Sequence, residues 1–252
     1  MWRTLQGLGM RLADAILPRQ CHGCGRVLGH EGHFAFCEAC WSSIRLVVPP
    51  YCPCCGRPFR SPVALTYSPE HRCGACRNRP PAFDHARAIG RYEGTLREAI
   101  HLLKYRGKLR LTRPLLQLAL DHYPAHFGGM GFDAMIPIPL HPSRLMQREF
   151  NQAAILARGL GRALGIVVWE RALVRTRWTQ PQVELSGDER RRNVRNAFAV
   201  TDPSHVEGKA LLLIDDVLTT GATLGEAARA LKARGATRVD VLALARVVRG
   251  VD

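Results

Sequence analysis

Residues 211–223 read LLLIDDVLTTGAT, and this stretch decides the fold. Ala210 to Ile214 is an apolar run typical of a buried strand, and the carboxylates Asp215 and Asp216 end it. Val217 to Thr223 then lead through small residues into a helix. Because ligands of open α/β sheets bind at the carboxyl ends of the strands, the stretch predicts an α/β domain with a ligand at this turn.

The side chains of this turn suit a phosphorylated sugar. Two adjacent carboxylates accept hydrogen bonds from vicinal hydroxyl groups, as on a ribose. The helix that begins near Ala222 directs its positive end at an anion. The amides and hydroxyls that could surround a phosphate belong to Thr219, Thr220, Gly221, Ala222 and Thr223. The alternative is a βα unit that carries Asp-Asp and a Thr-Gly turn without binding a ligand.

Short apolar strands and helical patterns alternate from Ala82 onward, which is the signature of a parallel sheet. The predicted strands are residues 85–92, 133–139, 209–216 and 238–248. The predicted helices are residues 94–108, 150–165 and 221–235. Residues 170–208 are rich in arginine and weakly periodic, and a connection of that length in a compact domain is usually functional or mobile.

All nine cysteines lie between Cys21 and Cys76, and eight of them form CxxC pairs. The pairs are Cys21 with Cys24, Cys37 with Cys40, Cys52 with Cys55, and Cys73 with Cys76. Two such pairs supply the four thiolates of a closed tetrahedral zinc site, so we expect two structural zinc ions and no catalytic one. A crossed arrangement of the pairs uses the same residues, and a disulfide scaffold is the alternative to metal. Cys54 is left over and is expected to be an unligated thiol.

The composition predicts three parts. Residues 1–18 have apolar positions near helical spacing and are expected to form a short docking helix. Residues 19–80 form the double zinc ribbon, which is too polar to fold without metal; structural zinc contributes roughly 10–16 kcal/mol in small peptides. The sequence Asn78 to Pro81 is expected to be a linker, and residues 82–252 form the α/β domain.

The charge indicates an anionic partner. Thirty-six Lys and Arg against 21 Asp and Glu give a net charge of +15, and two four-thiolate zinc sites lower it to about +11. Such a field suits nucleic acid or phosphorylated small molecules. No stretch reaches the roughly 18 apolar residues that a membrane span needs. The CxxC grouping and the lack of an export signal favour the reducing cytoplasm.

Four segments outside the cysteine pairs carry a family resemblance. They are RYEGTLREAIHLLKYRG (91–107), IPIPLHPSRLMQREFNQA (136–153), TQPQVELSGDERRRNVRNAF (179–198) and LLLIDDVLTTGAT (211–223). The last resembles the phosphoribosyl-diphosphate motif of type I phosphoribosyltransferases. With the ribbons, the four are similar to the ComF family of competence-associated proteins over nearly the entire chain. The resemblance implies a type I phosphoribosyltransferase fold behind an N-terminal double zinc ribbon.

The resemblance also implies roles for particular residues. Asp215 and Asp216 would hold the ribose hydroxyls and residues 219–223 the 5-phosphate, with Mg²⁺ accompanying the diphosphate. The turn after residues 133–139 lies where these enzymes bind pyrophosphate, and its expected contacts are His141, Ser143 and Arg144. Residues 179–198 resemble the loop that closes over the diphosphate. One departure is Glu149, a carboxylate where ComF relatives usually have glycine in an RGFNQ string.

Three functions are compatible with these features. ComF membership implies a module that holds single-stranded DNA during uptake, alongside other DNA-uptake proteins. Its physical support is the charge and a cluster of arginines with aromatic side chains available for stacking. The cluster is Arg190, Arg191, Arg192 and Arg195, and the aromatic residues are Trp169, Trp178 and Phe198. A solvated helix face is the alternative for the cluster.

The second function is an active phosphoribosyltransferase with an unknown acceptor. Metal would neutralise the pyrophosphate, and the two aspartates would steady the ribose as the bond breaks. Glu184 and His101 are conceivable bases. The third function is a sensor that binds the diphosphate without chemistry.

Overall fold

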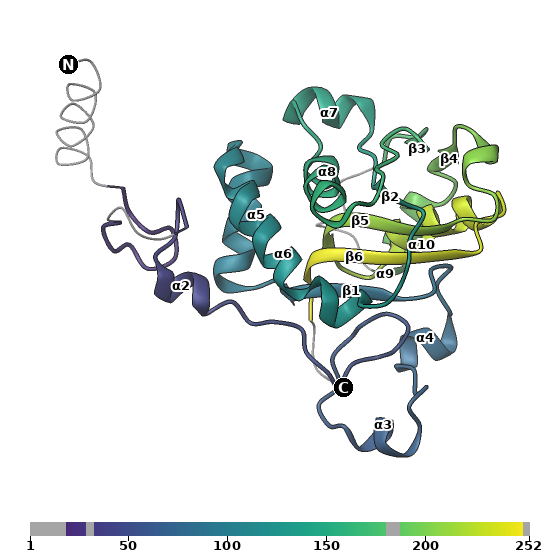
Figure 1. Ribbon diagram of the computed structural model, residues 1–252, viewed down its shortest axis with the longest axis horizontal. Coiled ribbons are helices and arrows are strands. Elements are labelled where there is room, and N and C mark those ends of the chain that lie inside the picture. Colours follow the sequence, from purple (N-terminus) through teal and green to yellow (C-terminus); the bar gives the residue numbers. More distant parts are fainter. Residues whose placement is uncertain (1–18, 29–32, 180–186, 249–252) are drawn as a thin grey trace.

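The computed structural model describes residues 19–28, 33–179 and 187–248. The helix expected over residues 1–18 lies outside these residues. A parallel sheet of four strands occupies the centre, in the order β1-β6-β5-β2 (Figure 1). Its strands are β1 (Ala86–Arg91), β2 (Ala134–Pro137), β5 (Ala210–Leu218) and β6 (Arg238–Arg246).

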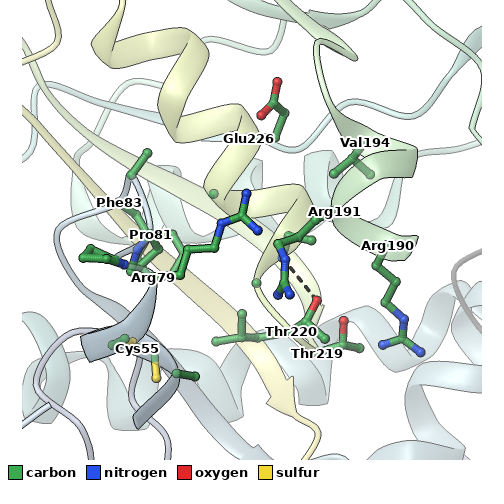
Figure 2. Close-up of a pocket in the computed structure, with 18 of the residues that line it drawn as sticks. Cys55, Arg79, Pro81, Phe83, Arg190, Arg191, Val194, Thr219, Thr220 and Glu226 are labelled. Carbon is green, nitrogen blue, oxygen red and sulfur yellow. Dashed lines mark hydrogen bonds between the residues drawn. The ribbon is translucent and has the colours of Figure 1, made fainter. Parts of the chain in front are cut away.

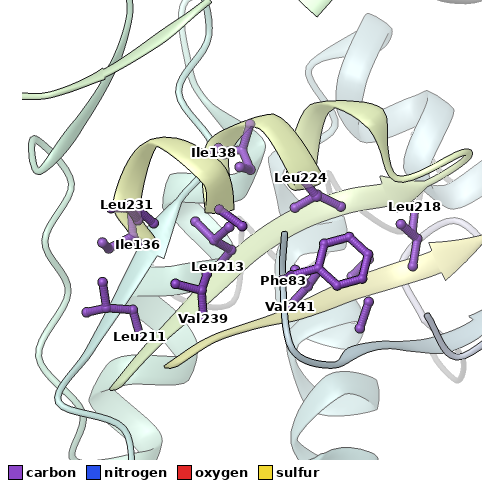
Figure 3. Packing of buried hydrophobic residues seen from close by; sticks show 14 of the residues in the cluster. Phe83, Ile136, Ile138, Leu211, Leu213, Leu218, Leu224, Leu231, Val239 and Val241 are labelled. Carbon is purple, nitrogen blue, oxygen red and sulfur yellow. The ribbon is translucent and has the colours of Figure 1, made fainter. Parts of the chain in front are cut away.

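Helices cover both faces of this sheet. Leu212 and Ile214 of β5 belong to one buried cluster, and the alternate residues Leu211 and Leu213 belong to another (Figure 3). The first cluster packs under α5 (Gly94–Arg106), α6 (Thr112–Phe127) and α8 (Gln152–Leu164). The second packs under α10 (Ala222–Lys232). Burial on both faces explains why the strands read as continuous apolar runs.

All seven predicted strands and helices of the α/β domain are confirmed within a few residues at their ends. Helix α6, with 16 residues and Pro124 near its end, is not among the predicted helices. The arginine-rich stretch is partly ordered, because β3 (Leu173–Arg175) and β4 (Phe198–Val200) pair in antiparallel fashion. The smaller elements are α7 (Pro142–Arg148), α9 (Gly187–Val194), η1 (Leu109–Leu111) and η3 (Pro203–His205). Among the described residues, no helix is long and apolar enough to cross a membrane.

The eight paired cysteines form two separate clusters. Cys21, Cys24, Cys37 and Cys40 make the first, and Cys52, Cys55, Cys73 and Cys76 make the second. The pairs therefore combine in sequence order, and the crossed arrangement is wrong. Short helices follow or connect the pairs: α2 (Glu38–Ser42), α3 (Val63–Tyr67) and α4 (Gly74–Asn78). Cys54 is buried and belongs to neither ligand set, as expected.

Both clusters fit a tetrahedral zinc ion. A Zn–S bond of about 2.3 Å places tetrahedral sulfurs about 3.8 Å apart. The Sγ atoms of each cluster all lie within 4.8 Å of one another. The Cys24–Cys37 and Cys55–Cys73 sulfurs are 3.7 and 3.6 Å apart. Backbone amides also approach the sulfurs, with the Cys37 amide 3.3 Å from Cys21 Sγ. The two zinc sites of the double ribbon are thus structural, with all four positions taken by thiolates.

The second ribbon is not a separate module behind a linker. Gly56, at a φ of +70°, brings the ribbon backbone against the Ala86 carbonyl of β1, where a Cβ would collide. The Ala86 amide donates to the Cys54 carbonyl at 2.7 Å, and Arg246 Nη1 of β6 donates to the Cys55 carbonyl at 2.7 Å. Phe83, just past the expected linker, is 4% exposed in the cluster under α10. The second ribbon and the α/β domain therefore share one core.

We predict two zinc ions per chain with unequal structural roles. Cys37→Ser should release one zinc and lower the melting temperature of the α/β domain by the smaller amount, because its cluster packs on the core under α5 and α6 but only Cys21 of the four is fully buried. Cys73→Ser should also release one zinc and lower that temperature more, because all four cysteines of its cluster are buried in the core under α10. Metal analysis of purified protein and thermal unfolding followed by circular dichroism are the measurements. Cys54→Ser is the control and should keep both ions; a single zinc in the wild type would contradict the two-site assignment.

Candidate functional site

A cavity of about 1100 Å³ opens at the carboxyl ends of the parallel strands. Tyr92 follows β1, Ile138 follows β2 and Val247 follows β6, and all three line it with the end of β5. This is the edge at which open α/β sheets bind ligands. We call it the carboxylate cavity, because Asp215 and Asp216 form its floor.

The two aspartates differ in their surroundings. Asp216 is 7% exposed, and its Oδ2 lies 2.7 Å from Nζ of Lys104 on α5. Asp215 is half-buried, and its Oδ1 accepts a hydrogen bond from the Asp216 backbone amide at 2.9 Å. Lys104 therefore neutralises one carboxylate and leaves the other facing the cavity. The sequence analysis missed Lys104, although it lies in the segment 91–107 that carries the family resemblance.

The pKa values of the pair move in opposite directions. Burial and the neighbouring Asp216 carboxylate raise the pKa of Asp215 to about 7. Burial also opposes ionisation of Asp216, but the charge and hydrogen bond of Lys104 bring its pKa below the usual value. Near neutral pH, Asp215 is therefore partly protonated and partly ionised. A ligand that donates hydrogen bonds to its oxygens favours the ionised carboxylate.

The turn after β5 has the geometry expected of an anion site. Gly221 caps α10 at a φ of +77°, in the left-handed region that glycine tolerates. Thr219, Gly221, Ala222 and Thr223 line the carboxylate cavity at the start of this helix. Thr220 does not line it; this residue faces a second cavity on the other side of the turn. The phosphate contacts predicted from the sequence are therefore divided between two cavities.

The walls of the carboxylate cavity are strongly basic. Its six cationic residues outnumber its three carboxylates, so the ligand that it attracts is anionic. The cations are Arg97, Lys104, Arg144, Arg148, Arg175 and Arg190. Burial and the nearby Arg144 lower the pKa of Arg175 to about 10. Only Arg144 and Arg190 of this set are predicted from the sequence. Arg97, Lys104 and Arg175 come from elements that folding brings together, and Arg148 lies on the same helix as Arg144.

The three expected pyrophosphate contacts have different positions. Arg144 lines the cavity, and its Nη2 donates to the Thr179 carbonyl at 2.9 Å. His141 and Ser143 instead bond to each other at the start of α7, with Nδ1 and Oγ 2.8 Å apart. Neither of these two residues is among those that line the cavity. Arg144 is therefore the member of the set placed to contact a ligand.

Glu149 occupies a position suited to glycine. It ends α7 with a φ of +64°, in the left-handed region that disfavours a side chain. Its exposed carboxylate lies at the cavity wall beside Arg148. The backbone conformation thus favours glycine at this position, as the family resemblance implies, and Glu149 adds both strain and negative charge.

The arginine cluster lies on α9 and just past its end. Arg190, Arg191, Arg192 and Arg195 all line the second cavity, and Arg190, only 5% exposed, lines the carboxylate cavity as well. The solvated-face interpretation fits Arg192 and Arg195, which are exposed, but not Arg190. Of the three aromatic candidates, Trp178 is 52% exposed, whereas Phe198 is buried and unavailable for stacking. The half-buried Trp169 packs against His205.

The candidate bases give no catalytic assignment. Glu184 lies outside the described residues. His101 lines the cavity, with Nε2 2.8 Å from the hydroxyl of Tyr92 and its ring edge-on to Tyr105. These three side chains form an aromatic wall of the cavity.

Comparison with known proteins defines the class of protein. Residues 12–79 match the double zinc ribbon domain, and residues 151–250 match the phosphoribosyl transferase domain. With the parallel sheet, this is a type I phosphoribosyltransferase fold preceded by a double zinc ribbon. "Competence protein F" of Haemophilus influenzae is 32% identical over 86% of this chain and 93% of its own. "DNA utilization protein YhgH" of Escherichia coli K12 is 33% identical over 92% of this chain and 99% of its own. The chain belongs to the ComF family.

Among solved structures, this chain is similar to the glutamine phosphoribosylpyrophosphate amidotransferase of B. subtilis, complexed with ADP and GMP. It is 22% identical with a TM-score of 0.32, over 52% of this chain and 24% of that one.

We predict that Asp215 makes the protein less stable as the pH rises. Its pKa is about 7 in the folded chain against an ordinary value of 3.8, so the folded state holds a proton that the unfolded state has lost. The stability contributed by this proton is complete below pH 4 and is lost as the pH rises through 7. Asp215→Asn carries no such proton, so its advantage over the wild type should grow by about 1 kcal/mol between pH 6 and 8.

Chemical denaturation at several pH values measures this difference. Asp133→Asn is the matched control, because hydrogen bonding to the Ala210 amide lowers the pKa of Asp133 and its difference should stay constant above pH 6. A constant difference for Asp215→Asn as well would show that the Asp215 carboxyl is ionised throughout this range.

We also predict that Glu149→Gly stabilises the protein. Relief of the left-handed conformation contributes about 1 kcal/mol, partly offset by the greater freedom of glycine in the unfolded chain. Glu149→Gln keeps the strain and should leave stability unchanged. Equal stabilisation by both variants would assign the effect to charge and not to backbone conformation. The midpoint of urea denaturation is the measurement.

Proposed function

We propose that this ComF-family chain binds phosphoribosyl diphosphate with Mg²⁺ in the carboxylate cavity and handles single-stranded DNA during DNA uptake. The observation that carries the first part is the order of groups around the cavity. Asp215 faces a position where ribose hydroxyls can donate, and the α10 N-terminus with Thr223 lies beside it. Arg144 and Arg148 from α7 supply positive charge across the cavity.

The size and charge of the cavity support this ligand. Small-molecule sites commonly have volumes of about 300–1,000 Å³, so a cavity of about 1100 Å³ accommodates a phosphorylated sugar. A helix N-terminus stabilises a phosphate, and guanidinium groups bind diphosphate oxygens in bidentate fashion. Asp215 and Asp216 would meet the neutral, hydroxyl-bearing part of the ligand. Apart from Glu149 beside Arg148, the division of charge within the cavity follows the division of charge within phosphoribosyl diphosphate.

The carboxylates also fit an accompanying Mg²⁺. This ion prefers phosphate oxygens, water and one or two carboxylates as ligands. Asp215 offers such an oxygen, because it forms no ion pair in the described part of the chain, whereas Asp216 is engaged by Lys104. The ion would neutralise the diphosphate, and the chain's own residues would orient the ribose.

The second part of the proposal rests on the relatives and on charge. The relatives are named for competence and for DNA utilization, and this chain carries a net charge of +15. The arginines of α9 lie next to the proposed phosphoribosyl site. A basic surface binds the phosphates of nucleic acid irrespective of sequence, which suits a protein that handles incoming DNA.

An active phosphoribosyltransferase is the second candidate. The aromatic wall of Tyr92, His101 and Tyr105 favours it, because a planar acceptor could stack there. Release of pyrophosphate in the presence of candidate acceptors would distinguish a transferase from a protein that only binds the diphosphate.

We predict that Asp215→Asn weakens binding of phosphoribosyl diphosphate roughly tenfold or more, because a hydrogen bond to a charged group contributes roughly 1.5–3 kcal/mol. Asp216→Asn should weaken it too, but this variant also leaves Lys104 without its partner, so Asp215→Asn is the cleaner test. Thr223→Val should reduce affinity by removing a phosphate donor. Ribose alone should bind poorly to every variant.

Isothermal calorimetry with Mg²⁺ present measures these affinities. Asp121→Asn on α6 is the control, since its carboxylate is exposed and lies outside the cavity. If the wild type gives no heat at millimolar ligand, the fold has been kept without its phosphoribosyl site, and this part of the proposal fails.

A further inference from the structure

A second cavity, of about 940 Å³, lies between the second zinc ribbon and the α/β domain. Figure 2 shows Arg79 on the ribbon side and Arg190 and Arg191 on the α9 side, with Thr219 and Thr220 between them. We call it the arginine cavity. It shares Thr219, Gly221, Ala222, Arg190 and Val247 with the carboxylate cavity, so the two cavities adjoin at the turn after β5.

The described lining of the arginine cavity holds eight arginines and a single carboxylate. The arginines are Arg57, Arg79, Arg190, Arg191, Arg192, Arg195, Arg229 and Arg246. The carboxylate, Glu226, accepts from the Asn196 amide at 2.5 Å and pairs with Arg229 at 2.6 Å. Glu226 and Arg229 therefore balance one another and leave the charge of the other arginines in place.

Arg246 also has a structural role. It is 7% exposed, with Nη1 on the Cys55 carbonyl and Nη2 3.7 Å from Cys55 Sγ. Its charge compensates the thiolates of the second zinc site. The other six arginines of the lining come from two walls, two from the ribbon and four from α9 and the residue after it. Because they stand on two facing walls, an anion between them meets positive charge from both sides.

We infer that the arginine cavity holds successive phosphates of a single nucleic-acid strand, and this inference rests on the DNA-handling part of the proposed function. The positive charge of six guanidinium groups exceeds the negative charge of one phosphate, which indicates a ligand with several phosphates. A concave, basic site with Pro80 and Pro81 in its wall suits a flexible strand, whereas a duplex carries its phosphates on a rigid convex cylinder. The second zinc ribbon is therefore a wall of the strand site.

The test replaces arginines that line only this cavity. Arg79 and Arg192 are exposed, come from opposite walls and do not line the carboxylate cavity. Arg113 and Arg162 are exposed, lie on α6 and α8, and line neither cavity, so their double alanine variant is the matched control. Binding of a fluorescent oligothymidine is measured by anisotropy over a range of salt concentrations.

The slope of log K against log salt should fall by about 1.4 in Arg79→Ala/Arg192→Ala, since each lost phosphate contact removes about 0.7. The control pair should keep the wild-type slope. An equal fall in both pairs would assign binding to net charge and not to the cavity. An unchanged slope in both, or a duplex bound with the same dependence on Arg79 and Arg192, would overturn the inference.

Two further ligands separate the sources of phosphate and the two proposals. Inorganic triphosphate that binds through Arg79 and Arg192, with oligothymidine unaffected by their loss, would show a free polyphosphate site and overturn the strand. Phosphoribosyl diphosphate should bind Arg79→Ala/Arg192→Ala as it binds the wild type. If that ligand binds while the strand does not depend on the cavity, only the arginine cavity has failed. If the wild type binds no oligothymidine, the DNA-handling proposal itself has failed.

Discussion

Arg246 at the end of β6 joins the central sheet to the second zinc site, and much of the molecule depends on this contact. Its guanidinium bonds to the Cys55 carbonyl and approaches the Cys55 sulfur. A four-thiolate zinc site carries two negative charges, which are costly beside an apolar core unless a cation is close. Arg246 supplies that cation from within the sheet. The ribbon can therefore pack directly on β1 and share the core under α10.

This packing determines where ligands can approach. The ribbon closes one side of the phosphate turn and forms the arginine cavity, while α5 and α7 close the other side and form the carboxylate cavity. Both cavities place charge where burial is unfavourable. Asp215 shows the consequence, because its pKa of about 7 records the energy needed to ionise a carboxyl beside another buried carboxylate. Charged side chains in such unfavourable positions are expected at ligand-binding sites, where the choice of residue is determined by the ligand and not by stability.

The sequence predicted those parts of the structure that depend on local pattern. The strand, small turn and helix start of residues 211–223 form as expected, although β5 continues past the two carboxylates to Leu218. The cysteines form two clusters as expected, whereas the sequence had left open which pairs combine. Lys104 was missed because its partner, Asp216, is more than a hundred residues away. The two sides of the phosphate turn could not be separated either, since Thr220 and Thr223 differ only in which folded walls surround them. The composition of residues 78–81 is typical of a linker. It gives no sign that the ribbon before them packs against the α/β domain.

Folding also concentrates part of the positive charge in the two cavities. In the sequence, +15 describes a diffuse field that draws in any polyanion. In the structure, six cationic residues line one cavity and eight line the other, with Arg190 common to both. Carboxylates accompany the cations only on the side where ribose hydroxyls are proposed to bind, apart from Glu226, which Arg229 balances. The positive charge is thus divided by the Thr219–Ala222 turn into a site suited to a sugar phosphate and a site suited to phosphates alone. Since Arg190 lines both, a charged ligand in the carboxylate cavity would change the electrostatic field in the arginine cavity, where the strand is proposed to bind.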